Sequence, residues 1–175
     1  MLGSVNAAAA PPLVEAPRTR LPSLGARGEG WVIVQFALMG AALASGLFGP
    51  AWSSWPRLAT SAIGAGLIAS ALALFIRGFR DLSSNLTPFP RPLEKAHLVE
   101  TGAYGLVRHP LYGALVIVAL GWALLTASIP GFVMAGIMLA FADLKARREE
   151  AWLVTKYEAY TAYRGRTRRL IPWLY

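Results

Sequence analysis

Residues 102–112 hold the side chains whose chemistry is most informative, and they read Gly-Ala-Tyr-Gly-Leu-Val-Arg-His-Pro-Leu-Tyr. Pro110 suits the first position of a helix, because it has no N–H to lose and its φ is already helical. The residue before a proline is disfavoured in the helical region, so His109 is predicted to cap the helix. Arg108 and His109 then lie beside the free N–H groups and the positive end of the helix dipole. The segment therefore predicts an anion-binding site at the start of this helix.

A second cluster of charges, residues 143–150, reads Asp-Leu-Lys-Ala-Arg-Arg-Glu-Glu. On a helix Asp143, Arg147 and Glu150 form one stripe, and the lysine and the other glutamate form a second stripe four residues apart. This pattern is typical of a solvated helix face, and it is also compatible with one wall of a site. If the two clusters meet, cations and a helix N-terminus face carboxylates. A ligand that carries both a carboxylate and an ammonium group would complement both walls.

The composition is that of a membrane protein, with 55% hydrophobic residues, 15% charged residues and a mean hydropathy of +0.47. The chain has no cysteine, which excludes disulfides, thiolate metal sites and cysteine nucleophiles. Its two histidines are too few for a histidine-rich metal centre, so we predict no metal site. The net charge of +8 is explained better by contact with a bilayer than by contact with nucleic acid.

Four uncharged or nearly uncharged runs predict helices in a bilayer, at about residues 31–48, 58–76, 111–128 and 130–144. The first three approach the ~20 residues that cross ~30 Å of hydrocarbon. The fourth is shorter, and its length alone would equally suit a buried or re-entrant segment. We predict that the third and fourth runs form a helical hairpin and that the fourth helix continues beyond the membrane. The predicted fold class is therefore all-α, an integral membrane helical bundle whose cytoplasmic loop and C-terminal helix form a pocket.

The distribution of lysine and arginine supports this count of four spans. With four spans, 16 of the 17 basic residues lie on one side of the membrane, and Arg57 is the exception. Such an asymmetry predicts that both termini are cytoplasmic, whereas three spans would place the eight C-terminal basic residues outside. We expect a multi-pass protein of a bacterial inner membrane. Residues 1–28 are predicted to be a mobile tail, and residues 29–175 a single membrane domain.

The connection between the second and third runs, residues 77–108, is long for so small a protein. Loops of this length are usually functional or disordered. Prolines at every second position from residue 88 to 92 stiffen it towards an extended course, and a proline-rich spacer is the alternative. Near the C-terminus, three tyrosines between residues 157 and 163 recur every three positions. They are compatible with interfacial anchoring and with lining a pocket.

These motifs, in this order, resemble the isoprenylcysteine carboxyl methyltransferase family. That family is a branch of the membrane methyltransferases that also includes the phospholipid methyltransferases. The resemblance extends over about Leu58 to Tyr175. An additional arginine interrupts the Arg-x-Glu-Glu part of the pattern. The matching residues are Gly102, Tyr104, Val107, Arg108, His109, Pro110, Tyr112, Arg147, Glu149, Glu150, Leu153, Tyr160, Tyr163, Ile171 and Pro172.

The resemblance implies methyl transfer from S-adenosylmethionine, bound between the loop and the C-terminal helices. It implies that Arg108 and His109 contact the carboxylate of the cofactor, and that Glu149 or Glu150 contacts its ammonium group or ribose. Backbone near residues 98–99 would flank the adenine. The predicted catalytic residues are Arg108, His109 and Arg147. The predicted cofactor-binding residues are Leu98, Val99, Gly102, Tyr104, Arg108, His109, Tyr112, Glu149 and Glu150.

Several alternatives remain open on the sequence alone. Phospholipid methyltransferases use a Gly-x-Gly within a span for the cofactor, and Gly64-Ala65-Gly66 resembles it, although close helix packing explains the same glycines. The methyl acceptor is either a lipophilic molecule, such as an isoprenoid, a lipid amine or a carboxylate on an apolar tail, or a small thiol. A membrane oxidoreductase that uses NADPH and resembles sterol reductases is a second function. A small transporter is a third, but such proteins usually carry an ionisable residue within a span, and the four runs have none before Asp143.

Overall fold

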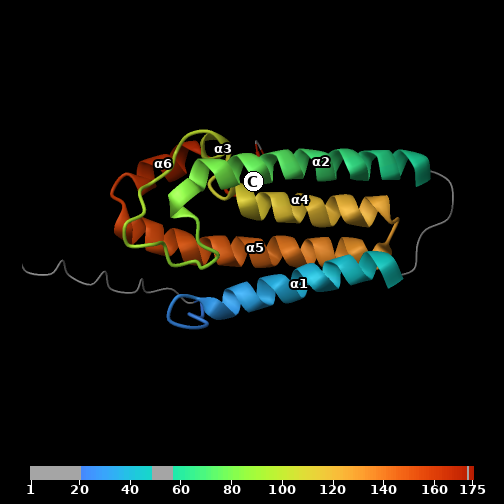
Figure 1. Cartoon of the computed structure of the whole chain (residues 1–175), viewed down its shortest axis with the longest axis horizontal. Coiled ribbons are helices and arrows are strands. Elements are labelled where there is room, and N and C mark those ends of the chain that lie inside the picture. The colour runs from blue at the N-terminus through green and yellow to red at the C-terminus, as the bar shows by residue number, and fades with distance from the viewer. Residues whose placement is uncertain (1–20, 49–56, 173) are drawn as a thin grey trace, which may run out of the picture.

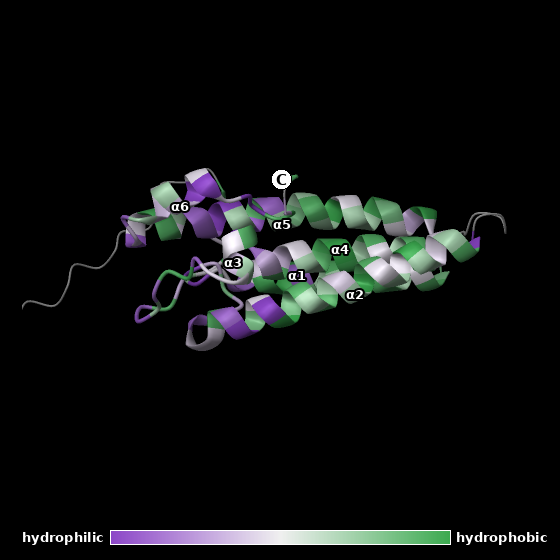
Figure 2. Cartoon of the chain, turned by 90° about the horizontal axis from the view of Figure 1, so that it is seen from above, coloured by the Kyte–Doolittle hydropathy of each residue, from purple (hydrophilic) through white to green (hydrophobic). Residues whose placement is uncertain are grey.

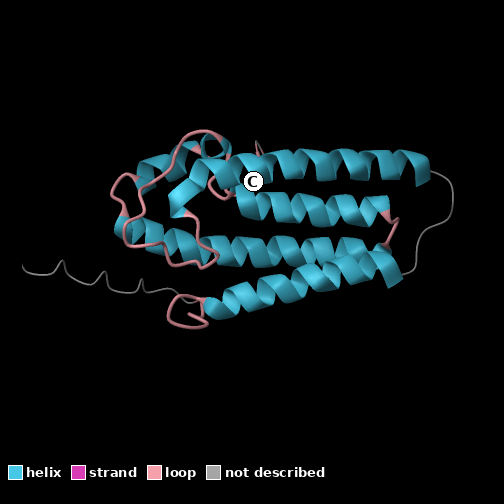
Figure 3. Cartoon of the chain, in the orientation of Figure 1, coloured by secondary structure: helices cyan, strands magenta, loops and turns pink. Residues whose placement is uncertain are grey.

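The computed structural model describes residues 21–48, 57–172 and 174–175, and Figure 1 shows their arrangement. Residues 1–20 of the predicted tail lie outside the described residues. Within the described ranges the chain is helical and contains no strand, which confirms the predicted all-α fold (Figure 3). The elements are α1 (Glu29–Phe48), α2 (Arg57–Leu82), the 3₁₀ turn η1 (Ser83–Asn85), α3 (Ala103–Leu106), α4 (Pro110–Leu125), α5 (Ile129–Lys156) and α6 (Tyr160–Arg166).

Three helices, α1, α2 and α5, are long and apolar enough to cross a membrane. The helix α4 is also apolar but has only 16 residues, because the chain turns at residues 126–128. Ala127 takes a positive φ of 54° in this turn. The Ser128 side chain then caps α5 by accepting a hydrogen bond from the backbone N–H of Gly131 at 3.1 Å. The predicted hairpin of two apolar helices is therefore present, and four spans and cytoplasmic termini stay predictions.

The helices pack side by side, with α4 between α2 and α5, and α1 against α5 and α4 (Figure 1). Small residues allow α2 and α4 to approach closely. A Cβ added to Gly64 would lie 2.5 Å from the carbonyl oxygen of Gly121, whereas Gly66 faces open space. Gly64 thus packs against the final turns of α4, at the opposite end of that helix from Pro110. Helix packing, one of the two interpretations of this Gly-x-Gly, accounts for Gly64.

Hydrophilic residues gather at the end of the bundle that carries α3 and α6 (Figure 2). We call this the polar end, and it comprises residues 21–29, 77–110 and 143–172. The helix α5 reaches it without a break, running from the apolar hairpin through the charged cluster to Lys156. The polar end therefore brings the loop, the charged part of α5 and the C-terminal segment together.

The C-terminal segment crosses the start of α4 through backbone contacts. Val107 and Arg168 form an isolated parallel bridge, and the N–H groups of Arg108 and His109 donate to the carbonyls of Arg168 at 2.8 Å and Arg169 at 3.0 Å. The segment then passes over Gly113, where an added Cβ would lie 2.0 Å from the carbonyl oxygen of Leu170. Only glycine permits this approach, so the first turn of α4 is built to carry the C-terminal segment.

Candidate functional site

A buried ion-pair cluster is centred on Glu150, which is 4% exposed. The Nε atoms of Arg108 and Arg169 lie 2.8 Å and 3.2 Å from Glu150 Oε1. The Arg108 Nη1 atom also donates to the carbonyls of Arg164, at 3.1 Å, and Thr167. The predicted walls of cations and carboxylates do meet at the polar end. In this cluster they pair with each other, and Arg108 ties the loop to α5 and to the C-terminal segment through its Nε and Nη1 atoms.

His109 occupies the cap position predicted for it, with a non-helical φ of −129° and ψ of 65°, and its side chain makes no capping hydrogen bond. The buried imidazole instead faces the two glutamates. Its Nε2 atom lies 3.4 Å from Glu150 Oε1 and its Nδ1 atom 3.8 Å from Glu149 Oε2. Its ring stacks on that of Tyr112, with centroids 5.4 Å apart and planes 5° from parallel. His109 is therefore packed between the ion-pair cluster and Glu149.

Glu149 faces two small cavities on the loop side of α5, and its Oε2 atom accepts a hydrogen bond from the Tyr112 hydroxyl at 2.7 Å. The first, which we call the loop cavity, has a volume of about 70 Å³ and is enclosed by the loop, α5 and α6. It is lined by Leu82, Asn85, Thr87, Pro92, Ala96, His97, Leu98, Val99, Tyr104, Arg108, Glu149, Leu153, Tyr157, Tyr160 and Tyr163.

The second, which we call the α4 cavity, has a volume of about 60 Å³ and lies at the start of α4. It is lined by Leu82, Thr87, Tyr104, His109, Leu111, Tyr112 and Glu149. Four residues line both cavities, namely Leu82, Thr87, Tyr104 and Glu149. A carboxylate held in place by a tyrosine thus stands at the boundary of two adjacent spaces.

The three C-terminal tyrosines line the loop cavity, in agreement with one of the two interpretations of their spacing. The Tyr163 hydroxyl donates to the carbonyl of Tyr104 at 2.6 Å, and the Tyr157 hydroxyl to the carbonyl of Ala96 at 2.6 Å. The Tyr160 hydroxyl is buried and has no hydrogen-bond partner among the described residues. Burial, with the nearby glutamates, raises the pKa of Tyr160 well above its usual value, so this phenol stays a hydrogen-bond donor.

The loop that covers the cavity is held by side chains that the sequence analysis did not single out. The Asn85 amide forms two hydrogen bonds with the backbone of His97, at 3.1 Å and 3.3 Å. The Asp81 carboxylate accepts a hydrogen bond from the backbone N–H of Ala103 at 2.7 Å. Their polar side chains, directly after the second apolar run, were the only indication of this role in the sequence. Their partners could not be predicted, because they are backbone groups of distant residues.

Three predicted site residues, Gly102, Arg147 and Glu150, line neither cavity. Gly102 shapes the turn before α3 with a φ of +63°, and an added Cβ would lie 2.2 Å from Asp81 Oδ2. Arg147 lies on the outer face of α5, with its side chain 54% exposed and its Nε atom 2.6 Å from Asp143 Oδ2. Glu150 lies directly behind the cavities in the ion-pair cluster. The residues that the structure brings to the cavities are Leu98, Val99, Tyr104, Arg108, His109, Tyr112 and Glu149.

Two buried polar atoms at this site make no hydrogen bond within the described part of the chain, His109 Nε2 and the Tyr160 hydroxyl. Buried polar groups are normally paired. His109 Nε2 faces Glu150 Oε1 at 3.4 Å in the ion-pair cluster, so the Tyr160 hydroxyl, which lines the loop cavity, is the atom that points to the position of a ligand. Glu149 supplies an acceptor in the same cavity. The described residues contain no cluster of three metal-ligating side chains. The hydroxyl and the carboxylate together fit an organic ligand with both polar and charged groups.

The fold and the site define a helical membrane protein with a cavity lined by tyrosines and a carboxylate at one end of its bundle. A family model described as phospholipid methyltransferase matches residues 59–160, which is more than half of the chain. The match extends from α2 to the start of α6 and includes Glu149. The chain belongs to the phospholipid methyltransferase family, within the group of membrane methyltransferases that the sequence resembles. No curated protein matches the chain.

Proposed function

We propose that this membrane methyltransferase uses S-adenosylmethionine and transfers its methyl group to a lipid-like or small amphiphilic acceptor. The observation that carries the proposal is the position of Glu149, inside the family match and at the boundary of the loop cavity and the α4 cavity. Two adjacent spaces are what a two-substrate transfer requires. The loop cavity is assigned to the methyl donor and the α4 cavity to the acceptor.

The residues of the loop cavity fit the donor in chemical type. Glu149, oriented by the Tyr112 hydroxyl, binds the ammonium group or the ribose hydroxyls. The Tyr160 hydroxyl donates to the carboxylate, because it has no acceptor among the described residues. Leu98 and Val99 provide an apolar wall for the adenine. The bound cofactor supplies a methyl group already activated on a sulfonium, so the protein's contribution is to position the reactants and to exclude water.

Binding requires the loop to move. A volume of about 70 Å³ is too small for a whole nucleoside cofactor. The loop is held down by individual contacts rather than by a packed helix, including the hydrogen bonds from Tyr157 to Ala96 and from Lys156 to Leu93. Such contacts can break and re-form on binding. We propose that the loop opens to admit the donor and closes over it.

The acceptor enters at the α4 cavity. Leu111 and Leu82 line it where the polar end joins the apolar helices, so an apolar tail can stay in the bilayer while the reactive atom reaches Glu149. An acceptor that is already an anion needs no base. An amine or thiol acceptor has to lose a proton, and Glu149 or the adjacent His109 is positioned to take it.

The test is methyl transfer by the purified full chain in detergent with bacterial lipid. S-adenosylmethionine carrying a labelled methyl group is incubated with a panel of phosphatidylethanolamine, an isoprenylated cysteine and a small thiol. We expect label in one acceptor and inhibition by S-adenosylhomocysteine. If no acceptor is labelled and NADPH drives reduction of an unsaturated lipid instead, the oxidoreductase alternative replaces this proposal.

The orientation of the chain is part of the proposal, because the donor is a cytoplasmic metabolite and the polar end has to face it. We propose that both termini are cytoplasmic, on the basis of the charge asymmetry. Reporter fusions after Phe48, Phe79, Ile129 and Tyr175 are expected to report outside, inside, outside and inside. A reporter after Tyr175 on the same side as one after Phe48 would overturn the arrangement.

A further inference from the structure

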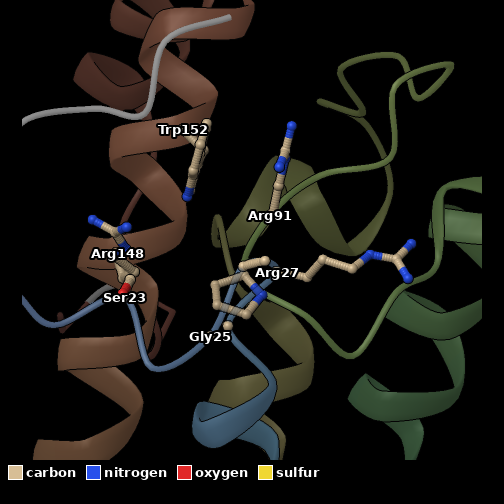
Figure 4. A pocket seen from close by; sticks show the side chains of 9 residues that line it. Ser23, Gly25, Arg27, Arg91, Arg148 and Trp152 are labelled. Atoms are coloured by element: carbon tan, nitrogen blue, oxygen red, sulfur yellow. The ribbon is translucent and has the colours of Figure 1, made fainter.

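Lys145 is a buried cation of α5, only 1% exposed, that lies outside the ion-pair cluster. It lines neither of the two cavities at Glu149. It also does not line the cavity of about 310 Å³ that Arg91, Arg148 and Trp152 form with the turn before α1 (Figure 4). Burying a cation is costly unless it has partners. The partners of Lys145 therefore indicate why a cation is placed here.

The ammonium group of Lys145 contacts three other parts of the chain. Its Nζ atom donates to Gln35 Oε1 in α1 at 2.6 Å and to the carbonyl of Pro88 in the loop at 3.1 Å. The same atom lies 5.1 Å from the ring centroid of Tyr112 in α4. An ammonium group has three N–H donors. Two oxygens and one aromatic face match these donors in number, and all three partners are neutral.

Tyr112 links this cation to Glu149. Lys145 and Glu149 are four residues apart on α5, so they lie one turn apart on the same face of the helix. Tyr112 contacts both of them. Its ring faces the Lys145 ammonium group, and its hydroxyl donates to Glu149 Oε2 at 2.7 Å. A single tyrosine side chain thus bridges a lysine and a glutamate on neighbouring turns of α5.

The cation acts on Tyr112 through the face of the ring. An ammonium group is attracted to an aromatic face, and the attraction is strongest where water is excluded, as it is around the buried Lys145. The ring is therefore held towards α5, which keeps its hydroxyl at Glu149. The His109 ring, stacked on that of Tyr112 with centroids 5.4 Å apart, further restricts its movement. Polar groups in such a chain also polarise one another, which strengthens the hydrogen bond to Glu149.

We propose that Lys145 is a positioning residue for the methyl donor. It holds Tyr112, and Tyr112 holds Glu149 in the orientation in which the carboxylate meets the ammonium group or ribose of the donor. This inference rests on the proposed function, which assigns that contact to Glu149. The competing explanation is a structural role, in which Lys145 only joins α1 and the loop to α5 through Gln35 and Pro88. The two explanations differ in whether the effect of Lys145 passes through the Tyr112 hydroxyl.

The test is a double-mutant cycle on the purified full chain in detergent. S-adenosylhomocysteine is titrated into the wild type, Lys145→Met, Tyr112→Phe and the double variant. We expect Lys145→Met to weaken binding by about 3- to 10-fold, as for a lost buried cation–π contact. Tyr112→Phe should weaken it by about tenfold, because the hydrogen bond to a charged group is lost. The double variant should stay within about twofold of Tyr112→Phe, because a phenylalanine ring cannot pass the effect on to Glu149.

Lys156→Met is the matched control for this cycle. The Lys156 Nζ atom also donates to a loop carbonyl, that of Leu93, and lies 5.1 Å from the ring centroid of Tyr157. The Tyr157 hydroxyl, however, donates to the carbonyl of Ala96 and not to Glu149. Any change in affinity caused by Lys156→Met should therefore be the same in the wild-type and Tyr112→Phe backgrounds.

Equal losses from Lys145→Met in both backgrounds would overturn the positioning role in favour of the structural one, and so would wild-type affinity in a folded Lys145→Met protein. If Lys145→Met does not fold, Lys145→Gln, which can still donate to Pro88, applies the same comparison.

A wild-type protein that does not bind S-adenosylhomocysteine would count against the proposed function instead. The hold of Lys145 on Tyr112 is then measured without a donor, by fluorine NMR of protein with fluorotyrosine at residue 112. We expect a single narrow resonance in the wild type and a broadened or divided one in Lys145→Met, because the ring is no longer fixed. Identical spectra would overturn the inference.

Discussion

Glu149 and Glu150 are adjacent residues of the same type, yet they belong to two different regions of the polar end. Glu150 is enclosed in the ion-pair cluster, bonded to Arg108 and Arg169. Glu149 faces the loop cavity and the α4 cavity, where its described hydrogen bond comes from the Tyr112 hydroxyl. Neighbours on a helix point about 100° apart. One carboxylate is thereby enclosed by ion pairs, and the other faces the cavities, where we propose that it binds a ligand.

We therefore expect the two adjacent glutamates to contribute to different properties, Glu150 to stability and Glu149 to binding. Removing one partner of a buried ion pair destabilises the fold, because the other partner is left buried with an uncompensated charge. Glu149 makes one described hydrogen bond, with the Tyr112 hydroxyl, so we expect its charge to matter less for folding than that of Glu150. Substitutions in the two regions should therefore affect different measurements.

The largest effect is expected for Glu150→Gln. Loss of this charge leaves the buried Arg108 without its carboxylate partner, whereas the partly exposed Arg169 keeps its ion pair with Asp143. Breaking a buried ion pair typically costs about 3–5 kcal/mol of unfolding free energy. The measurement is denaturant or thermal unfolding in detergent. Glu158→Gln, at an exposed glutamate two residues beyond the end of α5, is the control and should stay within about 0.5 kcal/mol of wild type. An unchanged midpoint for Glu150→Gln would mean that the ion-pair cluster does not stabilise the protein.

A smaller loss of stability is expected for Gly113→Ala. The new methyl group would overlap the carbonyl of Leu170 and displace the segment that carries Arg169 to Glu150, at a cost of about 1–3 kcal/mol. Gly136→Ala is the matched control, because a Cβ at Gly136 has no atom within 4 Å. Equal stability of the two variants in thermal unfolding would show that the C-terminal segment is not held closely against α4.

The smallest effect is expected for Arg147→Gln. Its side chain is half exposed and its ion pair with Asp143 lies at the surface, where such pairs contribute about 0–1 kcal/mol. Methyl transfer should be retained, since Arg147 lines neither of the cavities at Glu149. A stable Arg147→Gln protein without activity would restore the catalytic role that the sequence motif implied for this residue.

Several features of the fold could be predicted from the sequence because they depend on local pattern. The apolar runs gave the helices, and Pro110 gave the start of α4 with His109 as its cap. The helix α5 continues through its charged segment, as its residues indicate. The third helix was predicted to end at residue 128, but α4 ends at Leu125. The difference arises because Ala127 adopts a positive φ, which alanine rarely does, so the sequence does not indicate the turn.

Which of the two glutamates faces the cavities, and which lies in the ion-pair cluster, could not be predicted in the same way. Both match the motif, and which of them faces the cavity depends on how α5 is rotated against α4 and the C-terminal segment. The supports of the loop were also hidden, because Asn85 and Asp81 bond to backbone groups far along the chain. Backbone partners leave no pattern of side chains in a sequence.

We propose that Glu149, and not Glu150, contacts the methyl donor. Calorimetric titration of S-adenosylhomocysteine into the wild-type protein and into Glu149→Gln, both in detergent, tests it most directly. We predict binding by the wild type and a loss of about 10- to 100-fold in the variant, equal to about 1.5–3 kcal/mol for a charged hydrogen bond, with an unchanged unfolding midpoint. Wild-type affinity in a stable Glu149→Gln protein would contradict the assignment.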